Sequence, residues 1–154
     1  STCRVSPLMQ PTEHDIAWAA GFFEGEGSIN ILMANKRTRI YLRCCITNTD
    51  YSLLQFFQER WPGFIRTLSP RTYHKQAWQW VLAAKKAEQF LTLLVPHLKS
   101  DRISEKFRLA LEFQSQKLHS SGRNRSQEYH DRQWTYYDKM KILNVRGVHE
   151  ITIH

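Results

Sequence analysis

The residues of this sequence best suited to chemistry are two carboxylates separated by one glycine. Glu24 and Glu26 flank Gly25, and Gly27 follows them. The apolar pattern predicts a helix from Glu13 to Glu24, so both acids lie at its C-terminal end. The negative end of the helix dipole disfavours acids there by up to about 1 kcal/mol, and a hard divalent cation such as Mg²⁺ would compensate them. The plain structural alternative is a helix that ends at glycines, with its acids in water.

One face of this predicted helix carries almost no side chains. Ala17, Ala20, Gly21 and Glu24 recur at helical spacing and therefore share that face. Small residues allow two backbones to approach closely, as they do wherever helices pack tightly. The pattern therefore predicts a close contact between this helix and another one.

Length and composition indicate one globular domain that works inside a cell. The chain has 154 residues, enough for a substantial core. It contains no apolar run long enough to cross a membrane and no signal-peptide pattern, so we expect neither secretion nor membrane insertion. The three cysteines have neither zinc-ligand spacing nor a CxxC pair.

The positive charge is concentrated in one part of the chain. Ten basic and two acidic residues lie between Gly27 and Ala87, so this segment carries the entire net charge of +8. A focused basic surface is typical of nucleic-acid binding.

Hydrophobic periodicity predicts an α+β fold in which helices cover one face of a sheet and leave the other open. Alternation in the second strand puts Ile40 and Leu42 on a core face, and Arg39, Tyr41 and Arg43 on the opposite face. The remaining predicted elements are strands 28–34, 39–47, 64–68 and 76–82, helices 50–60, 85–95, 100–118 and 127–144, and a short extended tail, 148–153.

The stretch from Ala19 to Ser28, AAGFFEGEGS, resembles the signature of the LAGLIDADG homing endonucleases. The glycine-acid-glycine ending, the aromatic pair and the small-residue face match this signature. Ala19 replaces the first leucine, and glutamate replaces both usual aspartates. Further similarity at 46–54, 95–99 and 136–147 extends the resemblance to most of residues 13–147.

The resemblance implies a LAGLIDADG-type αββαββα domain with a saddle-shaped antiparallel sheet and extra C-terminal helices. Residues 1–12 would form a lead-in, 13–118 the core domain, and 119–154 a basic loop, helix and tail packed on the same domain. The sequence has one copy of the signature, and such members of the family act as homodimers. We therefore expect Ala17, Ala20, Gly21 and Glu24 at a twofold interface, and a pseudo-palindromic DNA target.

Roles for the site residues follow from the same resemblance. Glu26 and the Gly25 carbonyl would bind Mg²⁺, which Mn²⁺ can replace, whereas Ca²⁺ would support binding only. Asn48 would order water, although it can equally cap the following helix. Asp101 stands where the family usually has a basic residue, so we assign that role to Lys99 and Arg102.

DNA contacts are expected from the open face of the sheet and from basic loops, where arginine can pair with guanine and asparagine with adenine. The expected contacts are Asn30, Leu32, Lys36, Arg37, Arg39, Tyr41, Arg43, Arg66, Arg71, Lys75, Gln79, Arg123 and Arg125.

The implied function is that of an intron-encoded, site-specific endonuclease that cuts double-stranded DNA and leaves short 3′ overhangs. It would act in the compartment that holds its target genome, whether an organelle or a prokaryotic or archaeal cytoplasm. Two alternatives remain open on the same fold. One is a maturase that binds intron RNA, and the other is a catalytically silent DNA-binding regulator.

Overall fold

The computed structural model describes residues 8–34, 39–70, 75–118 and 126–153. The elements in chain order are α1 (Glu13–Glu26), β1 (Gly27–Ala34), β2 (Arg39–Asn48), α2 (Tyr51–Arg60), β3 (Phe64–Leu68), β4 (Ala77–Ala83), α3 (Ala84–Leu94), the 3₁₀ turn η2 (Val95–His97), α4 (Asp101–Leu118) and α5 (Gln127–Ile153). The α+β class and the αββαββα order are therefore confirmed.

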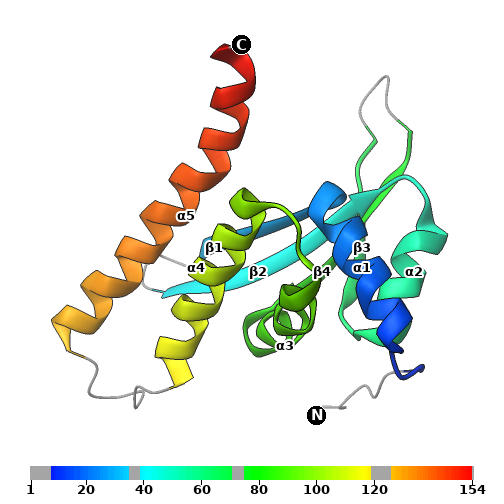
Figure 1. Cartoon of the computed structure of the whole chain (residues 1–154), viewed down its shortest axis with the longest axis horizontal. Helices are drawn as coiled ribbons and strands as arrows, with labels where there is room; N and C mark the ends of the chain where they lie inside the picture. Colours follow the sequence, from blue (N-terminus) through cyan, green and yellow to red (C-terminus); the bar gives the residue numbers. More distant parts are fainter. Residues whose placement is uncertain (1–7, 35–38, 71–74, 119–125, 154) are drawn as a thin grey trace.

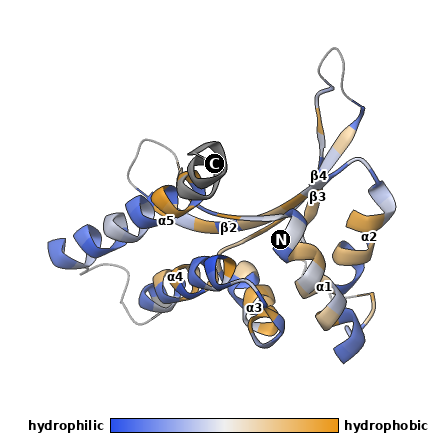
Figure 2. Ribbon diagram, turned by 45° about the horizontal axis from the view of Figure 1, so that its top comes forward, coloured by the Kyte–Doolittle hydropathy of each residue, from blue (hydrophilic) through white to orange (hydrophobic). Residues whose placement is uncertain are grey.

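The four strands form one antiparallel sheet in the order β1-β2-β4-β3. Figure 2 shows the sheet as a curved layer with α1, α2, α3 and α4 on one side. Helix α5 lies against β1. The opposite side of the sheet is largely uncovered (Figure 2), and the β3–β4 hairpin projects beyond α1 and α2 (Figure 1). One face is therefore free for a ligand, as the strand alternation predicted.

The core fills the space between the sheet and the helices. Ile40, Leu42 and Trp80 are buried from the sheet side, and Phe57 and Phe90 are buried from the helix side. The ring centroids of Trp80 lie 5.1 Å from those of both phenylalanines. Close aromatic packing of this kind stabilises a core beyond the area that it buries.

Helix α1 begins with a capping box and ends two residues later than predicted. The Thr12 hydroxyl accepts from the Asp15 N–H at 3.0 Å, and the Asp15 carboxylate accepts from the Thr12 N–H at 3.1 Å. At the other end the chain passes straight into β1 at Gly27. A Cβ at Gly27 would lie 2.3 Å from the Phe23 ring, so only glycine fits at this junction.

The prediction for the C-terminal tail was wrong. Helix α5 continues through Gly147 to Ile153, and residues 148–153 are helical rather than extended. A single glycine costs a helix about 1 kcal/mol relative to alanine, which weakens the helix without requiring it to end.

Helix α5 covers the edge of the sheet. The Asn144 side-chain amide donates to the Ile29 carbonyl at 3.1 Å, which satisfies a group on the outer edge of β1. Within the described ranges, no helix combines the length and the apolar character needed to cross a membrane.

Candidate active site and nucleic-acid interface

The Glu26 carboxylate lies at the junction of α1 and β1. Glu26 and Gly25 are both exposed. Among the described residues, no hydrogen bond or ion pair engages the Glu26 side chain. An exposed carboxylate at a negative helix end, with no internal partner, is available to a cation from outside the chain.

Glu24, unlike Glu26, has hydrogen-bond partners within its own chain. Its Oε2 accepts from the backbone N–H groups of Lys99 and Ser100, each at 2.8 Å. These bonds attach the turn before α4 to the end of α1. Glu24 therefore positions the turn before α4.

The attached turn and the first turn of α4 carry the basic residues that we assigned to the site. Lys99 belongs to the segment that Glu24 binds, and Arg102 follows that segment by two residues. Both side chains are exposed. Ser100 caps α4, because its Oγ accepts from the Ile103 N–H at 3.2 Å. Asp101 occupies the first turn, where an acid complements the helix dipole.

Asn48 lies at the same end of the sheet as Glu26. Gly27 pairs with Ile46, and Asn48 follows Ile46 by two residues at the end of β2. The Asn48 Oδ1 accepts from the Asp50 N–H at 2.8 Å, while the Asp50 carboxylate caps α2. The N-cap of α2 is thus Asp50 rather than Asn48. The Asn48 amide oxygen stabilises the turn that precedes α2.

The open sheet face brings together side chains from neighbouring strands, as the alternation predicted. Asn30 pairs with Arg43 and Leu32 with Tyr41, so all four side chains lie on this face, together with Arg39. The Arg43 Nε is buried and has no hydrogen-bond partner among the described residues. Arginine side chains on a cationic sheet face suit a base edge or a phosphate.

Gln79 differs from our expectation. Its side chain lies on the open face but is only 8% exposed. Its Oε1 accepts from the Arg66 Nε at 2.7 Å, and its Nε2 donates to the Thr47 Oγ1 at 3.0 Å and to the Cys45 Sγ at 3.4 Å. Gln79 is therefore not free to contact a base; it holds Arg66, which is exposed.

Of the contacts that we expected from the basic loops, Lys75 lies within the described residues and is exposed. The expected contacts that lie outside the described residues are Lys36, Arg37, Arg71, Arg123 and Arg125.

The small-residue face of α1 needs one correction. Ala20 is fully buried in the core of its own chain, so it is not available to a second copy. The exposed small residues are instead Ala17, Gly21 and Gly25, which recur every four residues along α1. The exposed small-residue face is therefore rotated about the helix axis relative to the one we predicted, because Ala19 and Ala20 are buried in the core.

Three further polar residues lie beside these groups and were not selected from the sequence. Thr47 continues the alternation of β2 onto the open face, so its periodicity could have identified it. Lys106 and Asn144 line a cavity with Gly27. No local pattern marks either of these residues, because helix packing alone brings them to β1.

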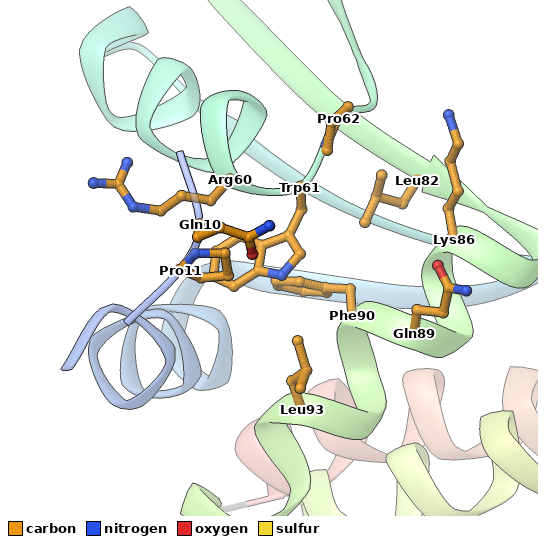
Figure 3. Close-up of a pocket in the computed structure, with 10 residues that line it drawn as sticks. All are labelled: Gln10, Pro11, Arg60, Trp61, Pro62, Leu82, Lys86, Gln89, Phe90 and Leu93. Atoms are coloured by element: carbon orange, nitrogen blue, oxygen red, sulfur yellow. The ribbon is translucent and has the colours of Figure 1, made fainter. Parts of the chain in front are cut away.

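A cavity of about 330 Å³ lies elsewhere, between the end of α2 and α3. Figure 3 shows Trp61, Phe90 and Leu93 forming its apolar wall, with Lys86 and Gln89 at its rim. None of the residues assigned to chemistry lines this cavity, so it is separate from the candidate site.

The donor set at Glu26 fits a metal only in part within one chain. In the portion of the chain that the structure describes, no three His, Cys, Asp or Glu residues cluster into a metal-binding group. Mg²⁺ commonly binds to one or two carboxylates and keeps phosphate or water as its other ligands. One carboxylate and one carbonyl thus suit a site completed by ligands from outside the chain.

Comparisons with solved structures identify the fold. I-CvuI, a homing endonuclease bound to its target with 2 mM Ca, matches with a TM-score of 0.68 at 17% identity, over 85% of this chain and 82% of that one. I-TnaI, another homing endonuclease, matches with a TM-score of 0.67 at 15% identity, over 93% and 99% of the two chains. The LAGLIDADG homing endonuclease I-GzeII, bound to its DNA target, matches with a TM-score of 0.60 at 14% identity, over 90% of this chain and 46% of that one.

This chain therefore has the fold of the LAGLIDADG homing endonucleases. No protein-family model matches the sequence, and the search of curated proteins finds no match.

Proposed function

We propose that this protein is a site-specific endonuclease that cuts double-stranded DNA as a homodimer with a divalent metal. The observation that carries the proposal is the exposed Glu26 carboxylate, which has no partner among the described residues and lies at the end of α1 beside a cationic sheet face. The structures that share the fold include homing endonucleases in complex with DNA.

The metal, Mg²⁺ or Mn²⁺, would activate water and neutralise phosphate charge. Glu26 and the Gly25 carbonyl would hold it, and the Asn48 side-chain NH₂ group, which has no partner among the described residues, would orient water. Lys99 and Arg102 would stabilise the negative charge of the phosphate. I-CvuI has been studied with Ca and, in another complex, with 2 mM Mg where the DNA was not cleaved. We expect Ca²⁺ to support DNA binding without cleavage.

Two observations support a dimer. The chain spans nearly the whole of I-TnaI but about half of I-GzeII. Gly21 and Gly25 are exposed, and a Cβ at either would meet nothing within 4 Å in its own chain. Two helix glycines each cost about 1 kcal/mol relative to alanine, and a closely approaching second helix would account for them.

The biological setting follows from the same proposal. The gene would lie within an intron, and cleavage would leave short 3′ overhangs at a long pseudo-palindromic site. The protein would work in the compartment that holds this target genome.

The first experiment is a selection from a long randomised duplex library, with Ca²⁺ for binding and Mg²⁺ for cleavage. We expect an inverted-repeat site that wild type cuts on both strands. Glu26→Gln should bind that site but cut it at least 100-fold more slowly, because the variant loses a charged metal ligand. Glu88→Gln, the same change at a remote position on α3, is the matched control and should cut normally.

A site that wild type binds but leaves intact in Mg²⁺ would contradict the endonuclease proposal and favour a DNA-binding regulator. If the library yields no bound duplex, binding to the flanking intron transcript would instead favour the RNA maturase.

A further inference from the structure

A cavity of about 280 Å³ adjoins the Glu26 site, between β1, α4 and α5. The residues of its lining that matter here are Gly27, Ser28, Asn30, Lys106 and Asn144. Gly27 follows Glu26 directly, so the cavity begins one residue from the proposed metal ligand. None of the described residues that line it is acidic.

Lys106 supplies the cation of this cavity. It is half-buried, and within the described ranges no ion pair or hydrogen bond engages its ammonium group. Burial, and secondarily the positive charge of Arg102, lower the pKa of Lys106. An anion in the cavity would offset both effects.

The other polar groups of the cavity add hydrogen-bond donors. Asn144 Nδ2 donates to the Ile29 carbonyl at 3.1 Å and to the Asn30 Oδ1 at 3.4 Å. These bonds occupy the Asn30 oxygen and leave its amide N–H groups without a partner among the described residues. The Ser28 side chain is exposed at the same edge. An ammonium, an amide and a hydroxyl together form a donor set for an oxyanion.

We propose that this cavity is a binding site for a phosphate group of the DNA backbone, with Lys106 as its cation and Ser28 and Asn30 as additional donors. Asn144 acts as the positioning residue, because it orients Asn30 from α5. The proposal rests on the proposed function and extends it: residues of α4 and α5 would help to hold the backbone of the DNA strand that meets Glu26.

The first test measures DNA affinity against salt concentration in Ca²⁺, with the duplex that wild type selects. Each neutralised phosphate contributes about 0.9 to the slope of log affinity against log salt. Lys106→Met should reduce the slope by about this amount, and Lys106→Arg should retain it. Lys85→Met on α3 removes an exposed cation remote from the cavity and is the matched control for net charge. Thermal unfolding of each variant verifies that it is folded.

The second test uses inorganic phosphate without DNA. In a titration followed by NMR, the side-chain amide signals of Asn30 and Asn144 should shift saturably in wild type but not in Lys106→Met, with sodium chloride at equal ionic strength as reference. This measurement does not depend on cleavage or on any DNA target.

The two tests separate the possible results. A salt slope that Lys106→Met leaves unchanged overturns the proposal, and a phosphate shift in that case assigns the cavity to free phosphate. If wild type selects no duplex, the proposed function fails by itself. The phosphate titration then tests the anion site alone. A chemical-shift change that Lys106→Met abolishes supports an anion site in the cavity, and the absence of any change in wild type overturns that site.

Discussion

Single side chains on the open sheet face are organised by hydrogen bonds that leave only some of them free to contact a ligand. Gln79 is the central residue of this arrangement, since it accepts from Arg66 and donates to Thr47 and Cys45. A buried amide with both ends engaged fixes the direction of the guanidinium that it holds. Arg66 is therefore presented in one orientation, which the proposed recognition of a base edge would require.

At this residue scale, Gln79→Leu should relax the choice of base at one position in each half-site. Leucine keeps the volume but removes the acceptor that orients the Arg66 Nε. A bidentate arginine contact discriminates between bases by about 1–3 kcal/mol, and most of that should be lost at the affected position. Competitive binding to single-base variants of the selected site measures the loss.

Gln79→Glu is the matched variant, since it preserves the acceptor for Arg66. It should retain the discrimination that Gln79→Leu loses. Equal specificity of wild type and Gln79→Leu would show that Arg66 does not depend on this network.

Among the elements, the junction between β4 and α3 contains a residue in a strained backbone conformation. The strand enters the helix without a loop, and Ala84 adopts a positive φ of 52° as the first residue of α3. Alanine in this region is strained by about 1–2 kcal/mol relative to its ordinary conformations. Ala83, which precedes it, has an ordinary extended conformation with φ −132° and makes no side-chain cap.

At the element scale, Ala84→Gly should raise the free energy of unfolding by up to about 1 kcal/mol. Glycine relieves the strain but gives the unfolded chain additional entropy, which offsets about 0.4–1 kcal/mol of the gain. Ala83→Gly has the entropic cost without the relief and should be destabilising. Urea unfolding of both variants gives the comparison, and equal effects at the two positions would contradict the strain argument.

In the whole molecule, the exposed face of α1 is expected to pair with its copy. Ala17, Gly21 and Gly25 lie on that face, and Glu26 follows at its end. A twofold axis beside this helix would bring two Glu26 carboxylates together, so that each can serve one strand of a duplex. A monomer offers one such carboxylate.

At the scale of the assembly, Gly21→Gln should affect the monomer and the dimer in opposite directions. A Cβ at Gly21 meets nothing in its own chain, so glutamine should stabilise the monomer by about 0.5–1 kcal/mol through helix propensity. In the dimer the added side chain would separate the two helices and raise the dissociation constant at least tenfold. Sedimentation equilibrium and denaturant unfolding measure the two effects.

Thr92→Gln, at an exposed position of α3, is the control for a surface glutamine and should leave association unchanged. If Gly21→Gln remains as tightly associated as wild type, the copies do not pair through this face.

Much of this molecule could be predicted from local sequence. The capping box at Thr12, the strand alternation at Arg39–Arg43 and the acid-glycine motif at Glu26 depend on neighbours within four residues, or on a period of two. Such patterns determined the order of the elements, the open cationic face and the principal candidate acid.

Only the tertiary structure decided which of these groups are free to act. In the folded chain Ala20 is buried, and the Gln79 amide is engaged in hydrogen bonds. Glu24 binds the turn before α4, and Lys106 and Asn144 lie at the edge of β1. The physical reason is that burial and hydrogen-bond occupancy depend on which surfaces pack together. Ser28, Lys106 and Asn144 are far apart in the chain, and nothing in the local pattern of any of them encodes the other two.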